Sequence, residues 1–180
     1  VVWNDREAGK AVCRVFNVTT GTMRTLPRPI YTLSNDGKFA LTADFARIQR
    51  MRPGYGYVGI TDLCEDQLAP EKSGVWKMDL DTGESELIFS LAEAANIPFR
   101  GGANTKTVTL EDKWNYFNHI LISPDDQRFI VLHRWRTNSN GNPTGGFTTR
   151  MFTVGIDGND RYELDPSGNT SHFIWRDSSH

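Results

Sequence analysis

Residues 119–133 read HILISPDDQRFIVLH: a short apolar segment, a Ser-Pro-Asp-Asp turn and a second segment rich in β-branched and aromatic residues. Residues 30–44, IYTLSNDGKFALTAD, repeat this order around a Ser-Asn-Asp-Gly turn. Two apolar runs joined by a tight polar turn are typical of an antiparallel hairpin. Because this hairpin occurs twice in the chain, the sequence predicts a fold built from repeated units.

A second kind of hairpin recurs three times, and a further strand follows each copy. Each copy alternates apolar and polar residues into a turn with Gly, which accepts the positive φ that such turns need. The copies lie at residues 15–21, 75–83 and 151–158, followed by strands at 23–26, 85–89 and 161–164. Four short antiparallel strands per repeat are the pattern of a propeller blade. The predicted fold class is therefore all-β: a partial β-propeller with about two and a half four-stranded antiparallel blades of a larger ring.

The repeats divide the chain into a single incomplete propeller arc over residues 1–180. A closed propeller has about four to eight blades, so the remaining blades are expected in further sequence of the same chain. With half of the rim outside it, this arc alone is expected to be inactive. The predicted parts are a partial blade at 1–29, a blade at 30–98, a top-face loop at 99–118, a blade at 119–165 and the first strand of the next blade at 171–180.

Composition excludes some partners. The net charge of −2 over 180 residues gives no basic field, so neither nucleic acid nor an anionic membrane surface is expected to bind. No apolar run approaches the roughly 20 residues that cross a bilayer. Cys13 and Cys64 have no metal-ligand spacing and are expected to be free, buried thiols. The compartment, cytoplasmic or periplasmic, is left open.

The candidate site lies at the ends of two predicted strands, where titratable groups gather. Antiparallel pairing around the turn at 124–127 would place His133 opposite His119 on one face, and a slip of one residue would break this pairing. Arg134 and Arg136 follow at the same rim, and Arg150 begins the next strand. Two imidazoles and three guanidinium groups suit anion binding and proton transfer. The alternative, about equally weighted, is that the histidines are hydrogen-bonded structural groups.

A loop of distinctive composition forms the second part of this hypothesis. Residues 50–57 read RMRPGYGY, in the longest predicted loop of the top face. Arg52 can neutralise a carboxylate, and Tyr55 or Tyr57 can donate a proton to a leaving oxygen, which suits an acidic sugar. The alternative is a loop packed by its own aromatic side chains.

Several short segments together resemble a known family. They are Asn118-His119, His133-Arg134-Trp135, Arg150-Met151-Phe152-Thr153, Ser171-His172-Phe173-Ile174-Trp175 and the Arg/Tyr loop. This set is similar to the oligogalacturonate lyases and their seven-bladed relatives that act on uronic-acid polysaccharides, most of all their uncharacterised bacterial members.

The resemblance implies β-elimination on an acidic oligosaccharide. His133 or His119 would be the base, Arg150 or Arg134 would hold the uronate carboxylate, and Arg52, Tyr55, Tyr57 and Arg136 would contact substrate. The family also implies a divalent metal, typically manganese. His172 matches the first ligand of this metal, and the other ligands would lie beyond residue 180.

Two other functions compete with this one. A non-catalytic propeller of the Tol-system type would bind a protein or another ligand, and a serine-peptidase propeller would require a downstream hydrolase domain. The convergence of His and Arg residues favours the lyase, because a pure scaffold needs no group of titratable side chains at one rim. Fold alone does not decide among them.

Overall fold

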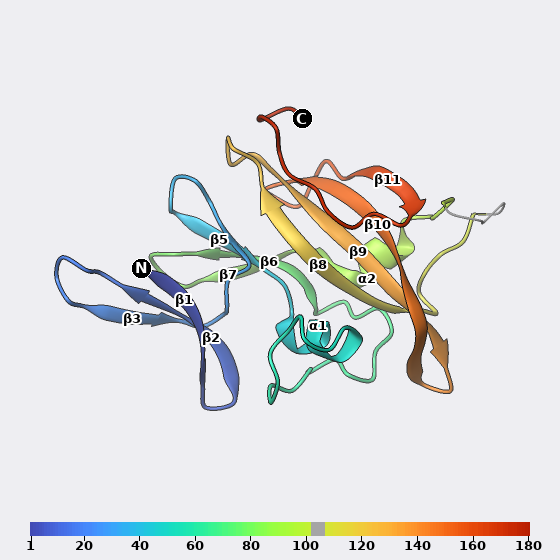
Figure 1. Cartoon of the computed structure of the whole chain (residues 1–180), viewed down its shortest axis with the longest axis horizontal. Coiled ribbons are helices and arrows are strands. Elements are labelled where there is room, and N and C mark those ends of the chain that lie inside the picture. The colour runs from blue at the N-terminus through green and yellow to red at the C-terminus, as the bar shows by residue number, and fades with distance from the viewer. Residues whose placement is uncertain (102–106) are drawn as a thin grey trace.

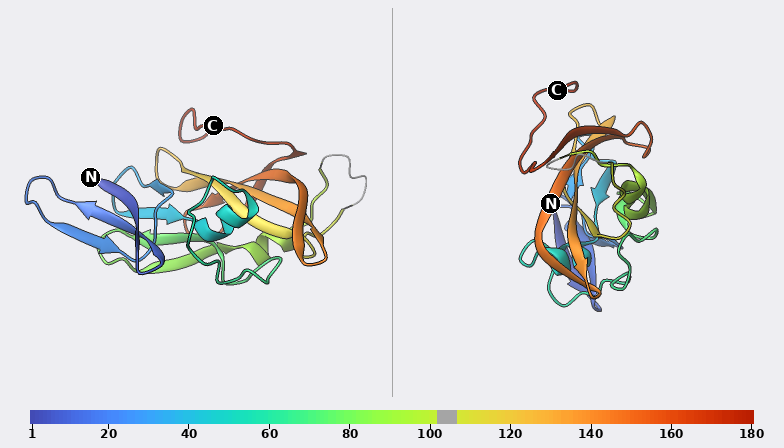
Figure 2. Two further views of the ribbon diagram at one scale, coloured as in Figure 1. Left: turned by 60° about the horizontal axis from the view of Figure 1, so that its bottom comes forward. Right: turned by 90° about the vertical axis from the view of Figure 1, so that its right-hand side faces the viewer.

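The computed structural model describes residues 1–101 and 107–180, and its strands form three antiparallel sheets. Figures 1 and 2 show the sheets in a row along the long axis of the molecule, with the first at one end and the third at the other. The first sheet contains β1 (Val2–Glu7), β2 (Lys10–Phe16) and β3 (Met23–Leu26). The second contains β4 (Thr32–Leu33), β5 (Phe39–Thr42), β6 (Gly74–Asp79) and β7 (Ser85–Ser90), and the third contains β8 (Trp114–Ile122), β9 (Arg128–Ser139), β10 (Asn142–Gly155) and β11 (Tyr162–Gly168). The predicted all-β class, with partial propeller-like blades, is confirmed.

In each sheet, strands that follow one another in the sequence lie side by side, as in a propeller blade. The two repeated hairpins predicted from the sequence are β4–β5 and β8–β9, and each of their turns contains a Ser hydroxyl that accepts hydrogen bonds within the turn. Ser34 Oγ accepts from the backbone of Lys38 and Phe39, and Ser123 Oγ accepts from that of Arg128. The repeated Ser therefore has a local structural cause.

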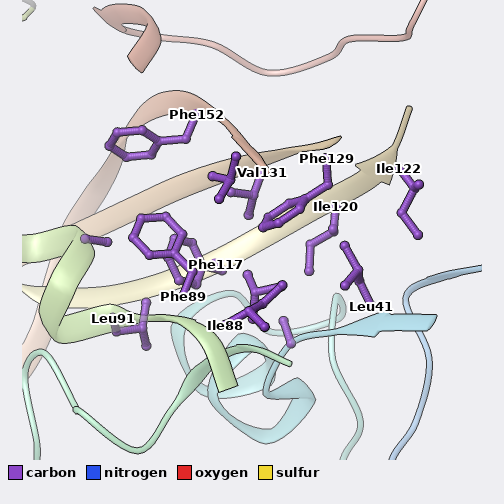
Figure 3. Close-up of a cluster of buried hydrophobic side chains, with 14 of the residues drawn as sticks. Leu41, Ile88, Phe89, Leu91, Phe117, Ile120, Ile122, Phe129, Val131 and Phe152 are labelled. Atoms are coloured by element: carbon purple, nitrogen blue, oxygen red, sulfur yellow. The ribbon is translucent and has the colours of Figure 1, made fainter. Parts of the chain in front are cut away.

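The main core lies between the second and third sheets (Figure 3). Phe89 of β7 contacts Phe117 of β8 and Phe152 of β10, with ring centroids 5.0 and 5.7 Å apart. A smaller cluster joins the first and second sheets and consists of Cys13, Leu26, Ala40, Met78 and Leu80. Each sheet thus packs its apolar face against the next one, which is how amphipathic blades bury their side chains.

Two short helices lie in the connections, α1 (Phe45–Met51) and α2 (Leu91–Asn96). Asp44 caps α1, and Ser90 with Glu93 forms a capping box at α2. From α1, the buried Arg47 donates to the Asn115 carbonyl at 2.7 Å and pairs with Asp62 at 3.3 Å. It also binds the carbonyls of Cys64, Gln67 and Leu68, so one side chain holds the long loop after α1 against the third sheet.

Some predicted boundaries differ from the structure. Strand β8 begins at Trp114, so residues 114–118 of the predicted loop 99–118 are strand, and residues 102–106 of that loop lie outside the described residues. Residues 171–180, all described, form no strand, and Trp175 Nε1 donates to the Leu121 carbonyl at 3.2 Å. The predicted first strand of a next blade is therefore wrong for this structure: the segment lies against the third sheet.

The structure also bears on the cysteines and on membrane spans. Cys13 and Cys64 are free and buried, as predicted. Within the described residues, neither helix has the length and apolar character that a membrane span requires.

Candidate functional site

His133 of β9 lies in the interior, with 0% of its surface exposed. Arg150 Nε donates to His133 Nδ1 at 3.1 Å, and His133 Nε2 lies 2.8 Å from Asn115 Oδ1. Because a guanidinium only donates, Nδ1 must accept, so the proton sits on Nε2 and is donated to Asn115. Burial, followed by the charge of Arg150, holds the pKa of His133 well below its usual value. The imidazole is therefore neutral and fully hydrogen-bonded.

Arg150 of β10 is equally enclosed, and its guanidinium binds the end of α2. Nη2 donates to the carbonyls of Ala94 and Ile97 at 2.6 and 3.0 Å, and Nη1 lies 3.4 Å from Glu163. Burial lowers its pKa to about 10, so it is charged at neutral pH. Every polar atom of His133 and the whole guanidinium of Arg150 face protein. The prediction that these two residues are catalytic is not supported, because their donors and acceptors are already used within the protein.

The predicted pairing of His119 with His133 is wrong. His133 lies opposite Phe117, and a β-bulge between Asn118 and Ile120 leaves His119 as the extra residue, with φ of 52°. A non-glycine residue in this region is uncommon, and bulges are over-represented beside functional sites. The bulge turns His119 away from the His133 network.

His119 instead joins Tyr31 and His172. The His119 backbone N–H donates to Tyr31 Oη at 3.1 Å, Tyr31 Oη lies 3.4 Å from His119 Nδ1, and the His119 and His172 rings are 6.3 Å apart. These three side chains line one side of a pocket of about 150 Å³. Burial, with the charges of Arg134, Arg52 and His172, lowers the pKa of His119 to about 4. The positive charges of Arg134 and Arg52, two residues of the predicted site, therefore help to keep the His119 imidazole neutral.

Next to this pocket, one face of the β8–β9 hairpin carries a row of polar groups. Trp114, Tyr116 and Asn118 alternate along β8, and Arg134 of β9 lies opposite Tyr116. Four buried polar atoms in this row have no hydrogen-bond partner among the described residues: Trp114 Nε1, Tyr116 Oη, Asn118 Nδ2 and Arg134 Nη1. Three of these atoms can only donate, and the fourth can donate. An unpaired buried donor is unfavourable by about 1–3 kcal/mol, so the row is suited to an acceptor-rich group.

Arg134 and Arg52 share one aromatic neighbour. The guanidinium carbons of Arg134 and Arg52 lie 4.6 and 4.9 Å from the ring centroid of Phe147 in β10, and Arg52 also stacks on Tyr55 at 3.7 Å. Arg52 Nη2 donates to Tyr55 Oη at 2.9 Å. Burial raises the pKa of the Tyr116 hydroxyl, and the charges of Arg134, Arg52 and Arg136, with the proximity of the Arg134 side chain, oppose this rise. The Arg134 side chain is close to this hydroxyl without meeting hydrogen-bond geometry. Two arginines and two exposed aromatic rings therefore surround the donor row.

Two residues predicted to bind substrate have structural partners instead. Tyr57 Oη accepts from Asn4 Nδ2 at 2.9 Å, and its ring stacks on Phe45 at 4.7 Å. Arg136 donates to the carbonyls of Met51 and Gly145 at 3.1 and 2.6 Å. Tyr57 of the Arg/Tyr loop is thus packed against Phe45 of α1, which is close to the alternative interpretation of this segment, a loop held by aromatic packing.

The described residues offer only part of a ligand set for a metal. His172 and His119 bring two imidazoles near one another, but the described residues contain no group of three His, Cys, Asp or Glu side chains placed to hold an ion. The neighbouring guanidinium charges also disfavour a cation. The manganese-type metal stays a prediction from the family resemblance.

Several members of this site were given no role in binding or catalysis from the sequence, although Asn118 belongs to the segments that carry the family resemblance. Asn118 and Tyr116 follow from strand alternation once β8 is known to begin at Trp114. Tyr31 comes from the neighbouring sheet and Phe147 from a hairpin with an irregular register, so no local pattern marks them.

No protein-family model matches the sequence, and no curated protein matches it either. Among solved structures, the chain is similar to the crystal structure of the tricorn protease, with a TM-score of 0.48 and 11% sequence identity. The match covers 90% of this chain and 11% of that one, so the chain spans about a tenth of the length of the matched protein. The description of the sheets as propeller-like blades rests on their own strand order and packing.

Proposed function

We propose that the pocket of His119, Tyr31 and His172, with the donor row beside it, binds an acidic oligosaccharide of the uronic-acid type, and that the whole protein cleaves it by β-elimination. The observation that carries this proposal is the buried Arg134 guanidinium, whose Nη1 has no partner among the described residues beside the unpartnered donors of Tyr116 and Asn118.

A carboxylate is the group that best satisfies such a row. It accepts on two oxygens and pairs with a guanidinium in a geometry that adds specificity to strength. Arg52, which stacks on the exposed Tyr55, supplies a second positive charge and an aromatic surface for a sugar ring. Neutral sugars can accept hydrogen bonds through their hydroxyl oxygens but carry no negative charge to pair with Arg134, so selectivity for the acid is expected.

The hydrogen bonds around Tyr31 favour His119 as the base. Tyr31 Oη accepts from the His119 backbone and lies 3.3 Å from Asn118 Oδ1, to which it can donate. With the Tyr31 proton directed to Asn118, His119 Nδ1–H donates to Tyr31, and Nε2 keeps its lone pair. In the proposed reaction Nε2 removes the proton next to the uronate carboxylate, the electrons form a carbon–carbon double bond, and the bond to the glycosidic oxygen breaks. The Tyr55 hydroxyl donates a proton to that oxygen.

Binding is tested first, by calorimetry of this chain with trigalacturonate and with its methyl ester. The acid is expected to bind and the ester is not. Arg134→Met is expected to weaken binding of the acid by at least about tenfold, since one charge-assisted contact contributes about 1.5–3 kcal/mol. Arg24→Met, which removes a partly exposed guanidinium on β3, is the matched control and should bind as the wild type does. Equal binding of acid and ester, or no effect of Arg134→Met, would contradict the proposal.

Cleavage is tested in the whole protein by the ultraviolet absorbance of the unsaturated product. His119→Ala should abolish product formation and Tyr31→Phe should lower kcat, while both retain binding. Binding without product would overturn the lyase assignment and leave a carbohydrate-binding propeller. Absence of binding would favour the Tol-type scaffold.

A further inference from the structure

A cavity of about 450 Å³ lies between the first and second sheets, apart from the pocket of His119. Four segments contribute to its wall: the β1–β2 turn with Lys10 at the start of β2, the β3–β4 connection with Arg28, the segment after β5 with Asp44, and the long loop before β6 with Lys72. Its floor includes Trp76 of β6. This volume is within the range of small-ligand sites, about 300–1,000 Å³.

The charge of this cavity is positive, in a chain whose net charge is −2. Lys10, Arg28 and Lys72 line it, and Asp44 is its one acidic residue among the described lining residues. The Asp44 carboxylate is already in use: Oδ1 accepts from the backbone of Ala46 and Arg47, and Oδ2 accepts from Ser73 Oγ at 3.3 Å. The Asp44 charge still acts on Arg28 and opposes the lowering of its pKa by burial, but the three cationic side chains outnumber this one carboxylate.

Arg28 is the centre of this arrangement. Its guanidinium carbon lies 3.6 Å from the centroid of the Trp76 ring, and Pro27 and Pro29 restrict the backbone on either side. Within the part of the chain that the structure describes, this half-buried guanidinium donates no hydrogen bond and forms no ion pair. Stacking uses the face of a guanidinium and leaves the N–H groups in its plane available for a planar, two-point contact. The Arg28 guanidinium, held on Trp76, thus lines the cavity with N–H groups that are available as hydrogen-bond donors.

From these contacts we infer that the cavity is an oxyanion-binding site, in which Arg28, held on Trp76, binds a carboxylate, sulfate or phosphate group in a bidentate manner while Lys10 and Lys72 supply positive charge. This site does not depend on the donor row of Arg134 and is independent of the lyase proposal.

The experiment titrates this chain with inorganic phosphate, inorganic sulfate and trigalacturonate. Two signals report binding: the fluorescence of Trp76 and the NMR resonance of Arg28 Nε–H. At least one of the three anions is expected to move both signals with the same saturation, and comparison among them identifies whether the oxyanion is a free ion or part of an acidic sugar chain. Trp76→Phe should remove the fluorescence response and keep the Arg28 response.

Variants then locate the site. Arg28→Met is expected to weaken binding at least about tenfold, and Arg28→Lys less, because Lys keeps the charge and loses the fork. Arg24→Met, which removes a guanidinium from β3 near the same connection, should leave the affinity for phosphate and sulfate unchanged. The inference is overturned if no anion moves the Arg28 resonance, if binding persists in Arg28→Met, or if Arg24→Met weakens it equally. Loss of trigalacturonate binding in Arg134→Met alone would concern the lyase proposal and not this site.

Discussion

The two faces of the β8–β9 hairpin differ in whether their buried polar groups have hydrogen-bond partners. On one face Asn115, His133 and Arg150 form a chain in which each donor has an acceptor. On the other face, Tyr116, Asn118 and Arg134 each keep an unpartnered polar atom within the described residues. Both faces hold the residue types from which a catalytic site was predicted, so residue type did not separate them. Satisfied polar groups thus stabilise this fold, whereas the unsatisfied ones mark where a ligand can be recognised.

The largest effect that tests this contrast is expected at Arg150. Arg150→Met would leave His133 Nδ1 and the buried Ala94 and Ile97 carbonyls without a donor. The free energy of unfolding, measured with urea, should fall by about 3–5 kcal/mol, the range for breaking a buried charged network. Arg24→Met should change it by less than about 0.5 kcal/mol. If Arg150→Met does not fold, Arg150→Lys, which can still reach one carbonyl, should show a smaller loss. A loss below about 1 kcal/mol for either variant would mean that the satisfied face is not what stabilises the fold.

A smaller effect is expected from pH through His133. Burial and Arg150 hold the pKa of the native His133 well below 6.5, and Arg150 is itself paired with Glu163. When the pH falls below about 6.5, the unfolded chain binds a proton at this position and the native chain does not, so the free energy of unfolding decreases with acidification. The contribution approaches about 1.4 kcal/mol per pH unit and vanishes above pH 7. The measurement is the unfolding free energy of wild type and His133→Gln from pH 7.5 to 5, and the wild-type curve should be the steeper. Parallel curves would show that His133 takes up its proton in the native state.

Sequence alone predicted the repeated hairpins, because apolar alternation and turn chemistry are local properties. It did not predict the bulge at His119, since one extra residue in a strand changes every later pairing without a sign in composition. The pairing of His119 with His133 failed for this reason. Arg134, Arg52 and Tyr55 were named as candidate residues and lie together, whereas Tyr31 and Phe147 join them only through packing between sheets and across a hairpin.

The hydrogen-bond partners of Arg134 and Arg150 distinguish the two residues better than their exposed fractions do. Both guanidinium groups are almost fully enclosed, with 1% and 0% exposed, and both belong to adjacent strands of the same sheet. Arg150 meets acceptors from α2, which packs on its side of the sheet, whereas Arg134 Nε finds Thr149 Oγ1 at 3.1 Å and Nη1 finds none among the described residues. A sequence does not state which face a helix will cover, so the structural arginine and the recognition arginine have the same local signature.

The smallest effect is expected at Tyr116, and it is the sharpest test of the open face. Its buried hydroxyl has no partner among the described residues, so Tyr116→Phe removes a polar atom and no hydrogen bond. The free energy of unfolding should stay within about 0.5 kcal/mol of the wild type or rise by up to about 1 kcal/mol, because an unpaired buried group is unfavourable. Tyr31→Phe is the matched control: its hydroxyl accepts from the His119 backbone, and its removal should lower stability by about 1 kcal/mol. If urea unfolding shows Tyr116→Phe to be the more destabilising of the two, the Tyr116 hydroxyl is satisfied in solution and the two faces are alike. If Tyr116→Phe keeps its stability and loses affinity for trigalacturonate, the unpaired hydroxyl serves the ligand rather than the fold.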